Sequence, residues 1–254
     1  MLNVLIQKTF SEKTYNEDVF CFGDDFAMVF DGASGLDQAD RMHTGSDARW
    51  FVENLKNEIE KNIHSHISLK QIVKNAIQTL IPLYPIVEKQ YMPSGCLSLV
   101  RIKNDTVEYI GFGDCVGLFE LQNQTLCLYD HNIEKLDNLA LQSKDPYPIL
   151  LNNRNLRNEI NGYCALDLTL KSLDFCIEKT FKKDDVISIS LMSDGFYQLK
   201  SFLKQNDEQF IATLYEQKEK ALPILYSLQE QDWPCQKLPR FKKRDDTTIL
   251  FFTL

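Results

Sequence analysis

Four aspartates stand at the ends of short apolar segments that have the composition of β-strands. Three of them follow such a segment and the last one precedes it: Asp31, Asp114, Asp194 and Asp245. An antiparallel arrangement of these segments can bring all four carboxylates to one edge. Carboxylates gathered there repel one another unless a cation compensates them, and a ligand set made only of oxygen suits Mg²⁺ or Mn²⁺ better than zinc. The pattern therefore predicts a site for hard divalent cations.

Each of these aspartates also has a plainer interpretation as a turn residue. Asp31-Gly32 and Asp194-Gly195 are Asp-Gly pairs, which are common in turns, and one such pair alone is weak evidence of a ligand. Two pairs after apolar segments, together with Gly113-Asp114 and Asp245-Asp246, are harder to explain by turns alone. A glycine after the aspartate also permits a tight turn and leaves its backbone carbonyl open to a metal ion.

The elements that must position these residues are short strands rich in β-branched and aromatic side chains. Strands are predicted over residues 19–22, 26–30, 97–102, 107–111, 117–121, 126–129, 173–177, 186–192 and 247–254. Helical spacing of apolar residues predicts one helix over about 46–63 and another from Ser68 until Pro82 and Pro85. A third helical region covers roughly 206–231, with a break near Pro223. Strands and helices that occur in separate runs favour an α+β layered domain.

Residues 131–162 lack helical or strand periodicity and are rich in Asn, Asp and Pro. A stretch of this length without regular structure is typical of a functional flap or of a mobile insert. A variable surface loop is the plainer interpretation. We expect a flap within 131–162 of a single domain that covers residues 1–254.

The composition excludes several classes of protein. The formal net charge is −8, which makes general nucleic-acid binding a poor hypothesis, and no apolar run is long enough to cross a membrane. The N-terminal residues do not form a signal peptide. Seven cysteines without a Cys-x-x-Cys pair indicate reduced thiols and no protein zinc site. These features predict a cytoplasmic protein with no membrane or nucleic-acid partner.

In chain order, the motifs resemble those of the metal-dependent serine/threonine phosphatases of type 2C, the PPM family, in their bacterial form. The matching segments are Asn16-Glu17-Asp18, 29–35 (VFDGASG), 93–97 (PSGCL), 110–114 (IGFGD), 129–132 (YDHN), 191–195 (LMSDG) and 244–248 (RDDTT). No single motif is decisive, but the ordered set is fairly specific and spans nearly the whole chain. The resemblance implies a four-layer αββα sandwich of two antiparallel sheets flanked by helices.

The resemblance also implies a set of metal ligands. Asp31 would bridge two Mn²⁺ or Mg²⁺ ions, and the Gly32 carbonyl would bind one of them. Asp194 and Asp245 would complete the site of the other ion. Asp114 would help to bind a third, weaker ion.

Other positions match the family less closely. Glu17 and Asp18 would hold metal-bound waters, and Lys13 stands where many members have a phosphate-binding arginine. Lysine lacks the bidentate fork of arginine, so phosphate positioning is expected to be looser. Ala33 replaces a histidine of many eukaryotic members, and Gln198 replaces an aspartate, which puts the third ion in doubt.

The function implied by the resemblance is hydrolysis of phosphoserine or phosphothreonine in proteins. A hydroxide that bridges the two ions would attack phosphorus, and no phosphoenzyme would form. The partner is then a phosphorylated protein. Two alternatives stay open. One is a non-catalytic phospho-binding or regulatory module on the same fold, which Lys13, Ala33 and Gln198 favour. The other is a phosphatase of a small metabolite.

Overall fold

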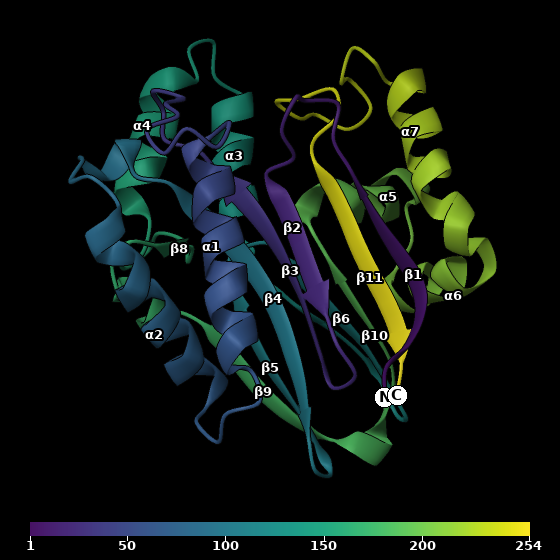
Figure 1. Cartoon of the computed structure of the whole chain (residues 1–254). Coiled ribbons are helices and arrows are strands. Elements are labelled where there is room, and N and C mark those ends of the chain that lie inside the picture. Colours follow the sequence, from purple (N-terminus) through teal and green to yellow (C-terminus); the bar gives the residue numbers. More distant parts are fainter.

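Two antiparallel β-sheets stack face to face in the computed structural model, which describes all residues 1–254 (Figure 1). The first sheet has the order β1-β11-β10-β6-β7, with bounds Asn3–Phe10, Thr247–Thr253, Val186–Met192, Val116–Leu121 and Thr125–Leu128. The second has the order β2-β3-β4-β5-β9, with bounds Asp18–Phe22, Phe26–Ala33, Ser94–Lys103, Thr106–Phe112 and Ile177–Lys182. A short strand, β8 (Leu166–Asp167), pairs with β4.

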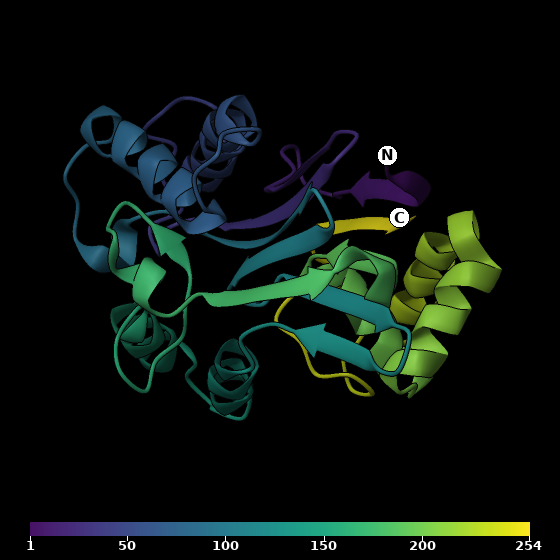
Figure 2. The ribbon, with the colours of Figure 1, turned by 90° about the horizontal axis from the view of Figure 1, so that it is seen from below.

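Helices cover the outer face of each sheet, and Figure 2 shows the two helical layers on opposite sides of the sandwich. The second sheet is covered by α1 (Asp47–Asn62) and α2 (Leu69–Leu80), and the first by α5 (Asp194–Leu203), α6 (Asp207–Gln217) and α7 (Ala221–Gln231). Two further helices, α3 (Asn132–Leu141) and α4 (Tyr147–Leu156), stand at one end (Figure 1). Short 3₁₀ helices are η1 to η5: Ile81–Leu83, Lys89–Tyr91, Lys171–Asp174, Lys183–Asp185 and Lys218–Lys220.

Three apolar cores separate these four layers, and alternation along the strands divides side chains between them. In β3, Met28 and Phe30 belong to the core under α1 and α2, whereas Ala27 and Val29 belong to the core between the sheets. A third core lies under α5 to α7. Successive strand residues point to opposite faces, so one apolar strand serves two layers. The predicted αββα sandwich is confirmed.

The helix predicted over about 46–63 is α1. The side chain of Ser46 accepts a hydrogen bond from the Arg49 amide and caps the helix. Phe51, Leu55 and Ile59 are fully buried against the second sheet. The fourfold spacing in the sequence therefore identified both the helix and its buried face.

Some predicted elements are wrong in type or missing. Residues 173–177 are not a strand, because η3 occupies Lys171–Asp174 and the strand β9 begins at Ile177. The edge strand β1 was not predicted. It pairs with β11 on one side only, and several of its residues are polar, such as Gln7 and Lys8, so it lacks the apolar run that marks a buried strand.

Three helices also differ from expectation. Asp194-Gly195 does not form a turn but opens α5, so this Asp-Gly pair is the first turn of a helix. The break in the 206–231 region lies at Lys218, whose φ is 42°, and not at Pro223. Pro223 lies in the first turn of α7, where proline removes no helical hydrogen bond.

The stretch 131–162 contains regular structure that its sequence did not indicate. It forms α3 and α4, and only a few buried side chains such as Ala140 and Asn153 attach the two helices to the rest. Each of the two helices is only ten residues long and buries few side chains, so its periodic signal in the sequence is short. We call residues 131–162 the flap.

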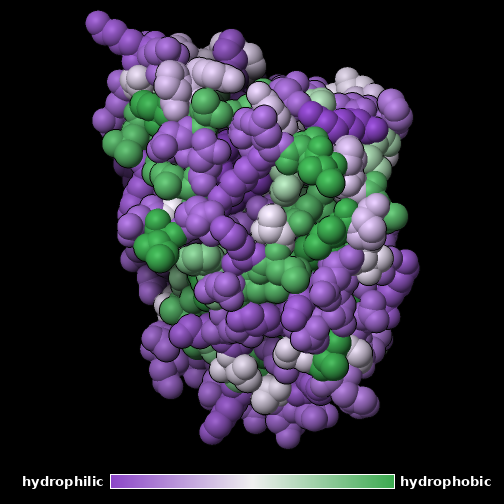
Figure 3. Space-filling view, turned by 90° about the vertical axis from the view of Figure 1, so that its left-hand side faces the viewer, coloured by the Kyte–Doolittle hydropathy of each residue, from purple (hydrophilic) through white to green (hydrophobic).

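No helix is both long and apolar enough to span a bilayer. On the face that carries α2 and α4, Figure 3 shows groups of apolar side chains separated by hydrophilic ones. The segment after α2 contributes exposed apolar residues, among them Leu83 and Ile86.

Candidate metal centre

Two carboxylates face each other across the first pair of strands in the second sheet. Asp18, at the start of β2, is the register partner of Asp31, near the end of β3. Asp18 is only 3% exposed, and neither of its carboxylate oxygens accepts a hydrogen bond. Buried polar groups nearly always have a partner, so this unpaired carboxylate marks a site with another purpose than packing.

The aspartates predicted from the sequence lie around this pair. Burial raises the pKa of Asp31 well above its usual range, and the negative charges of Asp18, Asp194, Asp114 and Asp245 raise it further. Strand register and these mutual charges place five carboxylates in one region of the molecule, from the start of β2, the ends of β3, β5 and β10, and the start of β11. We call Asp18, Asp31, Asp114, Asp194 and Asp245 the acidic edge.

Strand direction explains why these residues meet. β3 and β5 are both antiparallel to β4, so they end at the same side of the second sheet. In the first sheet, β10 ends beside the start of β11, which places Asp194 near Asp245. The antiparallel geometry expected from the sequence is the one observed.

Asp114 and Asp194 show the same kind of pKa shift. Burial, and then the charge of Asp194, raises the pKa of Asp114 to about 8. Burial also raises the pKa of Asp194, and the charge of Asp245 adds to the effect. A set of carboxyl groups that resist ionisation together favours any divalent cation that enters between them.

Two motif glycines let backbone segments approach the acidic edge closely. A side-chain carbon on Gly32 would lie 2.9 Å from the Glu17 carbonyl oxygen, and one on Gly195 would lie 2.1 Å from that of Asp246. The Gly32 amide donates to the same Glu17 carbonyl at 3.1 Å. Both glycines are therefore required by packing as well as by any role at a metal ion.

Only one carboxylate of the acidic edge forms an ion pair with a cationic side chain. Lys242 Nζ donates to both carboxylate oxygens of Asp245 at 2.6 and 2.9 Å, from a side chain that is half exposed. None of the other four carboxylates forms an ion pair with lysine or arginine. Most of the negative charge is thus left uncompensated by the protein.

Lys13, the predicted phosphate-binding residue, is held by two other carboxylates. Its ammonium donates to Glu17 Oε2 at 2.7 Å and to Asp246 Oδ2 at 2.9 Å. Asp246 also accepts hydrogen bonds from Ser11 Oγ and from the Glu17 amide. Asp246 is therefore a structural residue that joins the β1–β2 loop to β11. The Asp-Asp pair in the sequence did not reveal which of the two aspartates has this task.

Gln198 and Asp130 form their hydrogen bonds with residues outside the acidic edge. Gln198 Oε1 accepts a hydrogen bond from Gln229 Nε2 at 3.3 Å, which ties it to α7. Asp130 accepts from the Cys164 amide at 2.7 Å and holds the end of the flap. Asp137 of α3 was not predicted, although burial and the charge of Asp194 raise its pKa to about 6.

The residues of the acidic edge fit a hard divalent cation. The donors are carboxylate oxygens, and the unpaired oxygens of Asp18 are buried among them. As the side chains stand, no group of three or more His, Cys, Asp or Glu residues is close enough together to hold a metal ion. Mg²⁺ does not need a complete protein cage, because it keeps several waters and binds through one or two carboxylates.

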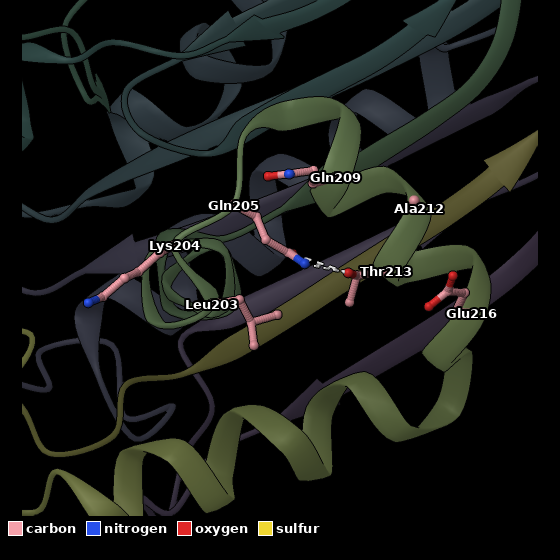
Figure 4. A pocket seen from close by; sticks show the side chains of 7 residues that line it. All are labelled: Leu203, Lys204, Gln205, Gln209, Ala212, Thr213 and Glu216. Atoms are coloured by element: carbon pink, nitrogen blue, oxygen red, sulfur yellow. Dashed lines mark hydrogen bonds between the residues drawn. The ribbon is translucent and has the colours of Figure 1, made fainter.

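Two shallow pockets lie elsewhere on the molecule. One, of about 440 Å³, lies between the end of α5 and α6, where Gln205 Nε2 donates to Thr213 Oγ1 at 2.8 Å (Figure 4). The other, of about 550 Å³, lies beside the start of α2 and η3. Neither is lined by a residue of the acidic edge, so the site is identified by its charges and not by its shape.

Comparison with known proteins gives a result at the level of the fold. No family model matches the sequence, and no curated protein matches it. The structure, however, is similar over nearly its whole length to solved bacterial phosphatases. The fold is that of the PPM-type serine/threonine phosphatases.

Three solved structures illustrate the similarity. The serine/threonine phosphatase PstP/Ppp of Mycobacterium tuberculosis has a TM-score of 0.61 and 12% identity, with 98% of this chain and 96% of that chain covered. Stp1 of Staphylococcus aureus has a TM-score of 0.59 and 11% identity, with 100% and 95% covered. The catalytic domain of PstP in complex with two manganese ions has a TM-score of 0.55 and 11% identity, with 97% and 95% covered.

Proposed function

We propose that the protein is a metal-dependent phosphomonoesterase that removes phosphate from phosphoserine or phosphothreonine in proteins. The observation that carries the proposal is the acidic edge, in which Asp18, buried and without a hydrogen-bond partner, lies with four partly exposed carboxylates, of which only Asp245 has a protein counter-ion. The similarity to serine/threonine phosphatases, one of them solved with two manganese ions, supports the same function. We further propose that the protein works in the cytoplasm.

The expected ligands are Asp31, the Gly32 carbonyl, Asp194 and Asp245, which would hold two Mn²⁺ or Mg²⁺ ions. When bound, such a pair of ions acidifies water to give a nucleophile and neutralises phosphate oxygens. Asp31 lies at the centre of the acidic edge and is the residue best placed to serve both ions. Asp114 supports a proposal for a third, weaker ion.

The remaining residues orient groups around these ligands. Glu17 accepts from Ser34 Oγ at 2.9 Å and from Lys13, so its carboxylate has a fixed position beside the turn after Asp31. Asp18 presents two free carboxylate oxygens that can accept hydrogen bonds from water. We propose that both hold water near the ions. Lys13 would contact phosphate with the part of its ammonium that faces solvent.

Hydrolysis of a phosphothreonine peptide and of a small aryl phosphate tests this function directly. We expect activity with Mn²⁺, loss of activity with EDTA, and loss of at least about 10³-fold in Asp31→Asn, which is about 4 kcal/mol of transition-state stabilisation. Activity that survives EDTA or Asp31→Asn would refute the proposal. Faster turnover of small phosphate esters than of phosphopeptides would indicate a small-metabolite phosphatase instead.

A non-catalytic phospho-binding module is the second candidate. The ion pair between Lys242 and Asp245 favours it, because an ammonium there competes with a metal ion for that carboxylate. The engagement of Lys13 by Glu17 and Asp246 favours it too. Calorimetry separates the two candidates: phosphopeptide binding without Mn²⁺ binding and without turnover would favour the module.

A further inference from the structure

An arginine of the flap reaches the segment that directly follows β3. Arg154, in α4, donates from Nη2 to the Ser34 carbonyl oxygen and from Nη1 to Ser94 Oγ, both at 3.1 Å. Ser94 begins β4 and pairs with Ala33 at the end of β3. The guanidinium therefore joins the flap to the strand ends that carry the acidic edge.

This guanidinium has no carboxylate partner. The chain has seven arginines, and five of them form ion pairs: Arg41, Arg101, Arg157, Arg240 and Arg244. Of the other two, Arg49 lies over the ring of Tyr15. Arg154 alone is a half-buried guanidinium whose hydrogen-bond partners are neutral oxygens. Its charge is available to an anion that arrives from solvent.

The position of Arg154 places that charge beside the acidic edge. The carbonyl oxygen of Ser34 accepts from Arg154, and the hydroxyl of Ser34 donates to Glu17 Oε1. Ser34 is therefore the single residue that connects the guanidinium to Glu17. On the flap, Asp137 experiences both charges, since Asp194 raises its pKa and Arg154 lowers it. Arg154 thus borders the place where ions and a phosphate group would meet, on the side of the flap.

Arg154 and Lys13 differ in how free they are to bind phosphate. Lys13 is shared between two carboxylates that already neutralise it. Arg154 uses one N–H of each terminal nitrogen on neutral acceptors, and a guanidinium has five N–H groups in a planar fork. Such a fork matches the geometry of phosphate oxygens better than an ammonium does.

We propose that Arg154 is a phosphate-binding residue that the flap supplies, and that phosphate bound by its free N–H groups holds α4 against the segment that follows β3. The inference rests on the proposed function. It assigns to the flap the guanidinium that contacts the substrate phosphate. The residue that precedes the early acidic motif is Lys13, which has an ammonium group and no guanidinium.

The test compares Arg154→Ala, Arg154→Lys and Arg154→Gln with the wild type, and Lys144→Ala serves as the control. Lys144 is an exposed flap lysine without a polar partner, so its removal changes the flap charge equally. The readouts are KM and kcat for the aryl phosphate and the phosphothreonine peptide, and Ki for inorganic phosphate. Mn²⁺ affinity is measured by calorimetry.

For Arg154→Ala we expect KM for both substrates and Ki for phosphate to rise by about 10- to 100-fold, the usual range for a lost hydrogen bond to a charged group. Mn²⁺ affinity should stay within about twofold. Arg154→Lys keeps the charge and should recover part of the loss. Arg154→Gln keeps a donor without the charge and should not, whereas Lys144→Ala should behave as the wild type.

Three results would overturn the inference. The first is an unchanged KM and Ki in Arg154→Ala, and the second is a loss confined to the phosphopeptide. The third is equal loss in all three Arg154 variants together with weaker Mn²⁺ binding, which indicates a purely structural role. If the wild type neither binds Mn²⁺ nor turns over substrate, the proposed function fails separately. Inorganic phosphate binding followed by ³¹P NMR then still tests Arg154: equal affinity in wild type and Arg154→Ala, or no binding, overturns it.

Discussion

Buried carboxylates occur in two very different settings in this molecule. Asp167 accepts from Arg157 Nε at 3.0 Å and from Asn158 Nδ2 at 3.1 Å, and Asp232 accepts from three backbone amides and from Arg240 Nη1 at 2.8 Å. Asp18, equally buried, has no partner. The buried carboxylates that hold the fold together are fully bonded, whereas Asp18, the buried carboxylate without a partner, lies in the acidic edge. This contrast separates structural from functional aspartates without reference to sequence conservation.

The largest effect on stability is expected where a buried ion pair is broken. Asp167→Ala leaves Arg157, which is fully buried, without its counter-ion, and we expect a loss of about 3–5 kcal/mol in the free energy of unfolding. Urea denaturation measures it. Asp174→Ala, which removes an exposed carboxylate nearby, should change stability by less than about 0.5 kcal/mol. A loss below about 1 kcal/mol in Asp167→Ala would mean that this carboxylate is not structural.

The same conservative change should act in opposite directions in the two settings. Asp18→Asn removes an unpaired buried charge, so the metal-free protein should gain about 1–2 kcal/mol at pH 8 in EDTA. Asp167→Asn should lose stability under the same conditions. The rise in Tm with Mn²⁺ should also be smaller in Asp18→Asn than in the wild type. Destabilisation of the metal-free protein by Asp18→Asn would contradict the distinction.

Acid should reduce the stability that the fully hydrogen-bonded aspartates contribute. The amide of Lys237, other backbone amides and Arg240 lower the pKa of Asp232 below its usual range. A carboxylate with a lowered folded-state pKa contributes stability above its unfolded pKa of about 4 and loses that contribution as the pH falls. Urea melts of wild type and Asp232→Asn should therefore differ most at pH 7, and the difference should begin to shrink as the pH falls below about 4. A difference that is as large at pH 3 as at pH 7 would show that the carboxylate charge is not responsible.

The smallest effect concerns the one member of the acidic edge that has a cation. Lys242→Ala frees Asp245, and since an exposed ion pair contributes about 1 kcal/mol or less, Mn²⁺ affinity should rise by up to roughly fivefold. Lys243→Ala is the matched control, because Lys243 lies over the ring of Trp233 and contacts no carboxylate. Weaker Mn²⁺ binding in Lys242→Ala would show that the lysine assists the site.

The sequence alone predicted the features that depend on local pattern. The short apolar run at 26–30 identified most of β3, and fourfold spacing identified α1. Asp31 and Asp194 were recognised because each follows an apolar strand. These signals are strong because an element that buries one face carries apolar residues at regular intervals, at every second position in a strand and at every third or fourth position in a helix.

Features that depend on contacts distant in sequence could not be predicted. Nothing in the sequence distinguishes Asp246, bonded to Ser11 and Lys13, from Asp245 beside it. The helices of the flap are short, which weakens their signal in the sequence. The approach of Arg154 to Ser34, 120 residues away, leaves no local pattern at all. Such residues become visible only when their partners, or the lack of partners, are seen in three dimensions.

Calorimetric titration of the wild-type protein with Mn²⁺, beside Asp31→Asn, tests most directly whether the acidic edge is a metal centre. We predict two Mn²⁺ ions per chain in the wild type and loss of tight binding in Asp31→Asn, whose fold stays intact by circular dichroism. A wild type that takes up no Mn²⁺, or an Asp31→Asn variant that binds two ions as tightly as the wild type, would contradict the account.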